Sequence, residues 1–151
     1  MAKESLFNIL QNRVDFEEIT VLDLFSGTGS ISFEFASRGC TDITSVELNF
    51  SHFRFIKETI AKLNEQSIKA IKGNAFQFVK KTAQQFDLVF ADPPYDHPKF
   101  KELPELVLSE NIIKAGGIFI LEHSKDYDFS DLPGFQELRH YGSVHFSVFE
   151  P

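Results

Sequence analysis

The residues Asp92-Pro93-Pro94-Tyr95 combine hydrogen-bond acceptors with a flat side chain. The two prolines fix the backbone dihedral φ and remove two N–H donors, so the backbone offers carbonyl acceptors in a stiff shape. Asp92 adds a carboxylate, and a planar base stacked on Tyr95 would gain about 1–3 kcal/mol. Acceptors that hold the hydrogens of an aromatic amine stabilise the positive charge that develops when its nitrogen attacks. These four residues are therefore predicted to be catalytic in methyl transfer to such an amine, and the alternative is a rigid turn with a structural Asp92.

A glycine turn is predicted where an early apolar strand ends. Gly27 and Gly29 allow positive φ and close approach of the backbone to a ligand. Ser32 stands where a dinucleotide-binding fingerprint would have its third glycine, which weakens the pyrophosphate interpretation. Asp23 would place a carboxylate near the same cleft, where it suits an ammonium group and repels a diphosphate. A nicotinamide-dependent oxidoreductase, which the α/β pattern also allows, is therefore disfavoured.

Two polar residues follow the next two predicted strands. Glu47 lies 20 residues beyond Gly27, where an acid can accept hydrogen bonds from both ribose hydroxyls of a nucleoside. The amide oxygen of Asn74 could accept a hydrogen bond from an adenine amine. A ligand with an adenine, an unphosphorylated ribose and a cationic amino-acid tail fits S-adenosylmethionine. The alternatives are that Asp23 is a buried acid that orders the glycine loop, that Glu47 is a solvated strand end, and that Asn74 is a helix cap.

Apolar, β-rich runs alternate with helical patterns along the chain, as expected for a parallel sheet covered on both faces. Strands are predicted at residues 20–24, 43–46, 68–71, 86–91 and 118–121. Helices are predicted at residues 5–11, 30–38, 53–63, 75–81 and 98–113, the last interrupted at Pro104 and stopped by Gly116-Gly117. Residues 135–141 and 144–149 are predicted to form a hairpin around Gly142-Ser143.

This order predicts an α/β fold, a doubly wound, seven-stranded, Rossmann-like methyltransferase sheet that is mostly parallel and ends in an antiparallel hairpin. Ligands of such sheets bind beyond the carboxyl ends of the strands. The residues that leave these strand ends are therefore the first candidates for a site, and they include Glu122 as a residue that could border the pocket. We expect a single domain over residues 1–151.

Composition limits the classes of function. The chain has 151 residues and a formal net charge of −7, which argues against tight binding of bare RNA or DNA by the whole surface. It has a single cysteine, Cys40, and its start lacks a secretory pattern, so we expect a reducing, cytoplasmic location. No apolar run approaches the ~20 residues that span a membrane, and the five histidines lack metal-ligand spacing, so neither a membrane nor a metal partner is expected.

The chain resembles the bacterial small-subunit (16S) ribosomal RNA guanine-N2 methyltransferases, which are class I S-adenosylmethionine-dependent enzymes. The resemblance rests on residues 3–10, on residues 21–29, on Ser37-Arg38-Gly39, on Val46-Glu47 and on the segment Asp92 to Tyr95. It implies that Glu47 holds the ribose of the cofactor and that Asp92 to Tyr95 hold the target guanine. The full set of cofactor-binding residues that it implies is Asp23, Phe25, Ser26, Gly27, Thr28, Gly29, Glu47, Leu48, Asn74, Ala75 and Asp92.

The resemblance also implies a partner, which is ribosomal RNA or an assembling small ribosomal subunit, and we expect the protein to act as a monomer. Two features depart from the family pattern. Asn74 stands where the family usually has Asp, so the acceptor remains but the charge is lost. A basic N-terminal extension typical of the family is expected to be missing, either by truncation or because RNA docking is reassigned. The remaining alternatives are adenine-N6 methylation of DNA or RNA and a cofactor-binding module without activity.

Overall fold

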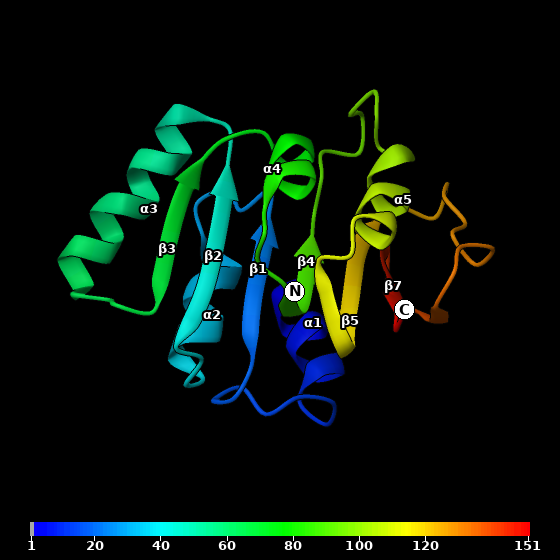
Figure 1. Ribbon diagram of the computed structural model, residues 1–151, viewed down its shortest axis with the longest axis horizontal. Coiled ribbons are helices and arrows are strands. Elements are labelled where there is room, and N and C mark those ends of the chain that lie inside the picture. The colour runs from blue at the N-terminus through cyan, green and yellow to red at the C-terminus, as the bar shows by residue number, and fades with distance from the viewer. Residues whose placement is uncertain (1) are drawn as a thin grey trace.

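The computed structural model describes residues 2–151. A single sheet of seven strands runs through the molecule in the order β3-β2-β1-β4-β5-β7-β6 (Figure 1). Five strands are parallel, namely β1 (Thr20–Leu24), β2 (Asp42–Glu47), β3 (Ile68–Lys72), β4 (Phe86–Ala91) and β5 (Ile113–His123). The last two, β6 (Phe135–Tyr141) and β7 (Val144–Phe149), form the predicted hairpin, and β7 pairs antiparallel with β5. The predicted fold class is therefore confirmed.

Helices cover both faces of the sheet. The face that packs into one apolar cluster carries α1 (Ala2–Leu10), α2 (Ser30–Ser37) and α3 (Phe50–Leu63). The opposite face carries α4 (Ala75–Lys81) and α5 (Glu102–Ser109), which pack into a second cluster. Because the middle of the sheet is buried on both sides, the central strands β1 and β4 are almost continuous apolar runs. Phenylalanine fills much of this core, and eight Phe side chains are among the largest that are fully buried.

One predicted helix is wrong at both ends. Residues 98–113 were expected to be helical with a break at Pro104, but α5 spans Glu102–Ser109 and contains Pro104 as its third residue. A proline in the first turn of a helix costs no hydrogen bond, because the N–H at that position has no partner within the helix. Buried Pro104 therefore belongs to the start of α5 and does not interrupt it.

The glycines expected to stop that helix belong instead to β5, which begins at Ile113 rather than at residue 118. Gly116 has φ +81°, and the pairing of β4 with β5 shifts register between Phe86 and Leu88. A Cβ atom at Gly117 would lie 2.8 Å from the backbone oxygen of Asp87. These glycines therefore form an irregularity in the strand, a position where glycine is often found. The other predicted elements are confirmed, with ends that differ by a few residues.

Among residues 2–151, no helix combines the length and the apolar character that crossing a membrane requires.

Candidate active site

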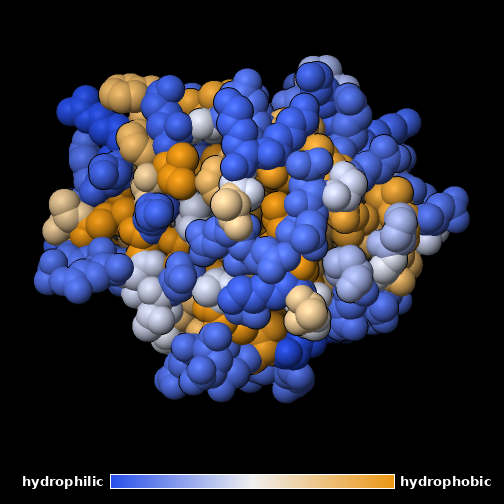
Figure 2. All heavy atoms as spheres, viewed as in Figure 1, coloured by the Kyte–Doolittle hydropathy of each residue, from blue (hydrophilic) through white to orange (hydrophobic). Residues whose placement is uncertain are grey.

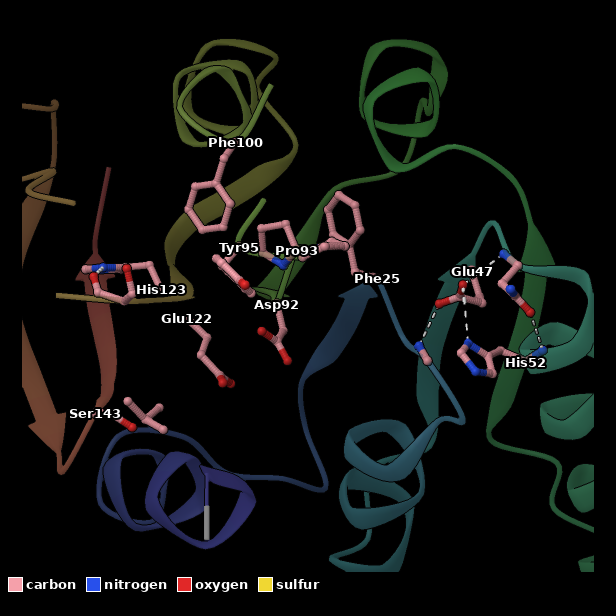
Figure 3. A pocket seen from close by; sticks show the side chains of 15 residues that line it. Phe25, Glu47, His52, Asp92, Pro93, Tyr95, Phe100, Glu122, His123 and Ser143 are labelled. Carbon is pink, nitrogen blue, oxygen red and sulfur yellow. Dashed lines mark hydrogen bonds and ion pairs between the residues drawn. The ribbon is translucent and has the colours of Figure 1, made fainter. Parts of the chain in front are cut away.

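A cavity of about 780 Å³ lies at the carboxyl ends of the parallel strands (Figure 3). Its walls come from the ends of β1, β2, β4 and β5 and from the turn between β6 and β7. A smaller cavity of about 370 Å³ lies beside it, against α4. The two cavities share Phe25, Glu47, Asn49 and Pro94 in their walls, so a ligand in one would lie next to a ligand in the other. This is the position that the strand order predicts for a binding site.

The turn after β1 is shaped by residues with positive φ. Phe25, Gly27 and Gly29 have φ values of 60°, 57° and 87°. At Gly29 a Cβ atom would lie 3.0 Å from Phe33 and 3.1 Å from Ile56, so glycine is required there by space as well as by conformation. The turn is tied to the next strand, because the N–H of Ser26 donates to the carbonyl of Val46 at 3.0 Å.

Glu47 links the glycine turn to the start of α3. Its Oε1 accepts the N–H of Gly27 at 2.6 Å, and its Oε2 accepts the N–H of Asn49 at 2.8 Å (Figure 3). His52 Nδ1 lies 3.9 Å from Oε2. The carboxylate is buried and is therefore not a solvated strand end. Each oxygen of a carboxylate has a second lone pair, so Glu47 can still accept ligand hydroxyls on the side that faces the cavities.

Asp23 lies beneath the glycine turn, and its side chain lines neither cavity. Ser32, also buried, donates its hydroxyl to Asp23 Oδ2 at 2.6 Å, and the Ser26 hydroxyl donates to the Asp23 carbonyl at 2.7 Å. Burial raises the pKa of Asp23 to about 7. These contacts agree with the alternative interpretation of Asp23 as a buried acid that orders the loop. Its hydrogen-bond partner is Ser32, which stands where a dinucleotide-binding fingerprint would have its third glycine.

The segment Asp92 to Tyr95 forms one wall of the larger cavity (Figure 3). Asp92 is open to the cavity, yet the surrounding protein desolvates its carboxylate and raises its pKa to about 6. The carbonyl of Pro94 accepts the N–H of His97 at 2.9 Å, whereas the carbonyl of Pro93 has no hydrogen-bond partner among the described residues. Tyr95 is 75% exposed. Asp92 and the Pro93 carbonyl are therefore acceptors in this segment that have no hydrogen-bond partner within residues 2–151.

Glu122 faces Asp92 across the same cavity (Figure 3). It is half-buried where β5 nears its end, and its pKa is raised to about 7, first by desolvation and second by the charge of Asp92. The adjacent His123 uses both ring nitrogens, since Nδ1 lies 2.7 Å from the carbonyl of Ser124 and Nε2 lies 2.7 Å from the hydroxyl of Ser147. Burial lowers the pKa of His123, which therefore serves as a neutral wall of the cavity. Glu122 thus joins Asp92 as a second carboxyl group that a substrate can meet.

The smaller cavity has flat apolar walls. The rings of Phe76 and His97 are stacked with centroids 5.1 Å apart, and Phe25 meets each of them edge-on at 6.2 Å. Asn74 caps α4, because its Oδ1 accepts the N–H of Gln77 at 3.2 Å. The helix-cap interpretation of Asn74 is therefore confirmed. Its amide nitrogen has no partner among the described residues and can still donate to a ligand.

The structure brings most of the predicted site residues together and leaves some apart. The predicted residues that line the larger cavity are Phe25, Gly27, Glu47, Asp92, Pro93, Pro94 and Tyr95. Those that line only the smaller cavity are Leu48, Asn74 and Ala75. Those that line neither are Asp23, Ser26, Thr28 and Gly29, which belong to the turn and its support.

Other lining residues were not predicted from the sequence. Asn49 and His52 begin α3, Phe100 precedes α5, and Ser143 and Val144 come from the hairpin turn. In the sequence, only their positions next to a strand end or a turn could have indicated that they line a cavity. Most residues at strand ends and turns of a protein do not belong to a binding site. No group of three or more His, Cys, Asp or Glu side chains within residues 2–151 is arranged to hold a metal ion.

The sheet order, the glycine turn and the cavity at Asp92 to Tyr95 together define a Rossmann-like fold of the methyltransferase type. The putative methylase HI0767 from Haemophilus influenzae has this fold, with a TM-score of 0.83, 26% sequence identity, and 99% of this chain and 95% of that chain covered. The chain belongs to the family described as Conserved hypothetical protein 95, whose model matches residues 1–150.

Curated relatives carry a more specific name. The "Ribosomal RNA small subunit methyltransferase D" of Buchnera aphidicola (subspecies Baizongia pistaciae) is 29% identical over 120 residues, which cover 80% of this chain and 61% of the relative. The protein of the same name from Haemophilus influenzae is 30% identical over 128 residues, with 82% and 65% covered. The chain thus spans a little over three fifths of the length of these relatives. The resemblance to small-subunit ribosomal RNA methyltransferases is confirmed by these matches.

Proposed function

We propose that this chain transfers the methyl group of S-adenosylmethionine to the exocyclic N2 amine of a guanine in small-subunit ribosomal RNA. The observation that carries the proposal is the juxtaposition of Asp92, the Pro93 carbonyl and Tyr95 in a cavity that shares a wall with a flat-sided slot. The names of the curated relatives support the class of substrate.

The smaller cavity and Glu47 fit the nucleoside part of S-adenosylmethionine. The flat walls formed by Phe76 and His97 suit an adenine, and the amide nitrogen of Asn74 suits a ring nitrogen that accepts a hydrogen bond. Glu47 lies between the two cavities, where its free lone pairs can accept ribose hydroxyls. The bound cofactor supplies a methyl group made electrophilic by a sulfonium.

The residues of the larger cavity prepare the amine. Asp92 and the Pro93 carbonyl accept its two hydrogens, which directs the nitrogen lone pair out of the plane of the base, and the exposed ring of Tyr95 stacks on that base. Methylation of the nitrogen would release one of its protons, and an oxygen of Asp92, which already accepts that hydrogen, would take it. A pKa of about 6 leaves Asp92 mostly ionised at neutral pH and able to take that proton.

Glu122 supports guanine as the target base. The edge of guanine next to its N2 amine carries a second donor, N1–H, and an ionised Glu122 beside Asp92 would accept it. Adenine carries an acceptor at the equivalent place, which an ionised carboxylate repels. The second candidate is adenine-N6 methylation. Because the pKa of Glu122 is about 7, part of the protein has a protonated Glu122 near neutral pH, and this carboxylic acid could donate to the acceptor nitrogen of adenine.

The experiment that tests the proposal is nucleoside analysis. Small-subunit RNA, free and in assembling particles, would be incubated with the protein and with S-adenosylmethionine labelled in its methyl group, and the RNA would then be digested to nucleosides. We expect the label in N2-methylguanosine. Label in N6-methyladenosine would support the second candidate, and label in protein alone would refute both. An Asp92→Ala protein, which lacks the side-chain acceptor, serves as the control for contaminating activity.

A further inference from the structure

The positive charge of this acidic chain is concentrated in one segment. Residues 50–82, which form α3, β3 and α4, contain seven Lys or Arg and two Glu, so their formal charge is +5 in a chain with a net charge of −7. The rest of the chain therefore carries −12. Two of its elements, β3 and α3, lie at one end of the molecule, because β3 is the edge strand of the sheet and α3 packs against it, whereas α4 lies nearer the middle of the sheet (Figure 1).

The cations of this segment also differ from the others in their partners. Arg54 is paired with Glu58 at 2.8 Å, but the other six form no ion pair among the described residues. We call these six the basic edge, and they are Lys57, Lys62, Lys69, Lys72, Lys80 and Lys81. Elsewhere in residues 2–151, five of the eight Lys and Arg side chains are in ion pairs, namely Lys3, Arg13, Arg38, Lys114 and Arg139. Because all six lysines of the basic edge are exposed, their charges are available to a partner.

The basic edge is continuous with the candidate active site. Lys81 and Asn74 line the same shallow hollow of about 330 Å³, and Asn74 also lines the smaller cavity. Lys72 is the last residue of β3 and pairs in register with Glu47. A chain of phosphates that followed these lysines would therefore reach the edge of the site.

Exposed apolar side chains lie along the same path. Leu48 and Phe50 are 60% and 59% exposed, and they flank Asn49, which lines both cavities. Phe55 on α3 is 52% exposed. Figure 2 shows hydrophilic and apolar side chains interleaved at this end of the molecule, over α3 and β3. Aromatic rings among cations form the surface on which single-stranded nucleic acids bind, because phosphates meet the cations while bases stack on the rings.

We propose that the basic edge, together with Phe50 and Phe55, binds an unpaired segment of the RNA substrate and leads it to the cavity at Asp92. The inference rests on the proposed function in that it takes RNA as the substrate. The negative charge of the remaining surface repels phosphates, so it favours approach of RNA from this end. The net charge of −7, which disfavours RNA binding by the whole surface, is thus compatible with binding at one edge.

The test compares two triple charge reversals of equal size. The first, Lys57→Glu with Lys69→Glu and Lys81→Glu, changes one lysine on each of α3, β3 and α4. The second, Lys99→Glu with Lys101→Glu and Lys125→Glu, changes the three exposed lysines outside the segment that form no ion pair within residues 2–151. Fluorescence anisotropy would measure binding of a labelled, unstructured, guanine-containing RNA between about 50 and 200 mM salt. Circular dichroism and the affinity for S-adenosylhomocysteine would show whether each variant keeps its fold and its cofactor pocket.

We expect the first triple to bind RNA at least ~10-fold more weakly and to lower the slope of log affinity against log salt concentration by about 2, since each lost phosphate contact removes ~0.7 for single strands. We expect the second triple to match the wild type. Equal losses in both triples, or none in the first, would overturn the inference. The inference would also be overturned if the first triple lost binding to small-subunit particles, measured by co-sedimentation, but kept its affinity for naked RNA. That outcome would indicate a protein partner.

Formation of N2-methylguanosine and binding of RNA are measured in separate experiments, so the proposed reaction and the role of the basic edge can fail independently. If the wild type makes N2-methylguanosine while both triples bind RNA alike, only the role of the basic edge is refuted. If the wild type makes no N2-methylguanosine while the first triple alone loses RNA binding, the proposed reaction fails and the role of the basic edge is supported.

Discussion

The hydroxyl of Ser32 donates a hydrogen bond to the carboxylate of Asp23 at 2.6 Å, and both side chains are buried. The bond joins the end of β1 to α2 on the two sides of the glycine turn. Ser32→Ala should lower the free energy of unfolding by about 1–3 kcal/mol, because it leaves a buried carboxylate without that donor. Urea denaturation at pH 8 would measure the loss, since Asp23 is mostly ionised there. Ser30→Ala, at an exposed position of the same helix, should have little effect, and equal losses in the two variants would refute this role of Ser32.

Asp23 should make stability depend on pH in an unusual direction. Its pKa of about 7 in the folded state lies above the ordinary value of 3.8, so the folded protein holds this proton more tightly than the unfolded chain does. The free energy of unfolding should therefore fall as pH rises from about 4 to about 7. Asp23→Asn should flatten this fall, while Asp92 and Glu122, whose pKa values are also raised, maintain part of it. Denaturation curves at several pH values would measure the slope, and an unchanged slope in Asp23→Asn would contradict the assignment.

Asp92→Ala should separate cofactor binding from turnover. The side chain accepts the amine hydrogens in the proposed reaction, so its loss should lower turnover by at least ~100-fold. Binding of S-adenosylhomocysteine should remain close to that of the wild type, because Asp92 lies outside the smaller cavity. Calorimetry and a single-turnover methylation assay give the two values. Normal turnover would remove Asp92 from the mechanism.

Glu122 should control the choice of base as a function of pH. Guanine methylation should rise as pH increases through about 6 and about 7, because Asp92 and Glu122 must lose their protons to accept from the base. Glu122→Gln should remove the upper inflection and increase the relative use of adenine, since an amide both donates and accepts. Rates on guanine and adenine substrates between pH 5 and 9 would test this. Glu105→Gln, an exposed position on α5, is the matched control and should leave the profile intact.

Glu47→Gln should weaken cofactor binding by at least ~10-fold, because one backbone N–H, of Gly27 or of Asn49, would then face an amide N–H₂. Thermal shift with S-adenosylhomocysteine measures the effect, and NAD in the same assay tests the oxidoreductase alternative. Stabilisation of the wild type by NAD but not by S-adenosylhomocysteine would overturn the proposed cofactor. Glu58→Gln, whose exposed side chain pairs with Arg54 at 2.8 Å, should behave as the wild type.

The sequence predicted the centre of the sheet well because strands such as β1 and β4 are buried on both faces and consist mainly of apolar residues. It predicted where the site lies because parallel strands bring their carboxyl ends to one edge, as at Glu47 and Asp92. It failed at Gly116-Gly117, where two glycines that could stop a helix lie instead within a strand. A pair of glycines looks the same in the sequence whether it ends a helix or lies within a strand. Only the pairing of β4 with β5 distinguishes the two structures here.

The contact that the sequence could not show is the one between Asp23 and Ser32. A carboxylate before a glycine turn can face the ligand or support the turn from below, and the difference depends on which way one side chain points. The burial of Ser32 decides it, and that burial follows from the packing of α2 against the sheet. Glu122 is a similar case, because its closeness to Asp92 comes from the pairing of β4 with β5.

The hairpin of β6 and β7 has a consequence for biosynthesis. Ser143 and Val144 in its turn form part of the cavity wall, and β7 pairs with β5 on the side away from β4. During translation the glycine turn and Asp92 therefore leave the ribosome well before the wall opposite them exists. A nascent chain that has reached residue 123 holds Asp92 and Glu122 but cannot enclose a base between them and the hairpin. The substrate pocket is consequently completed only when the hairpin has docked, so methylation of a base by an unfinished chain is disfavoured even though the basic edge is already present.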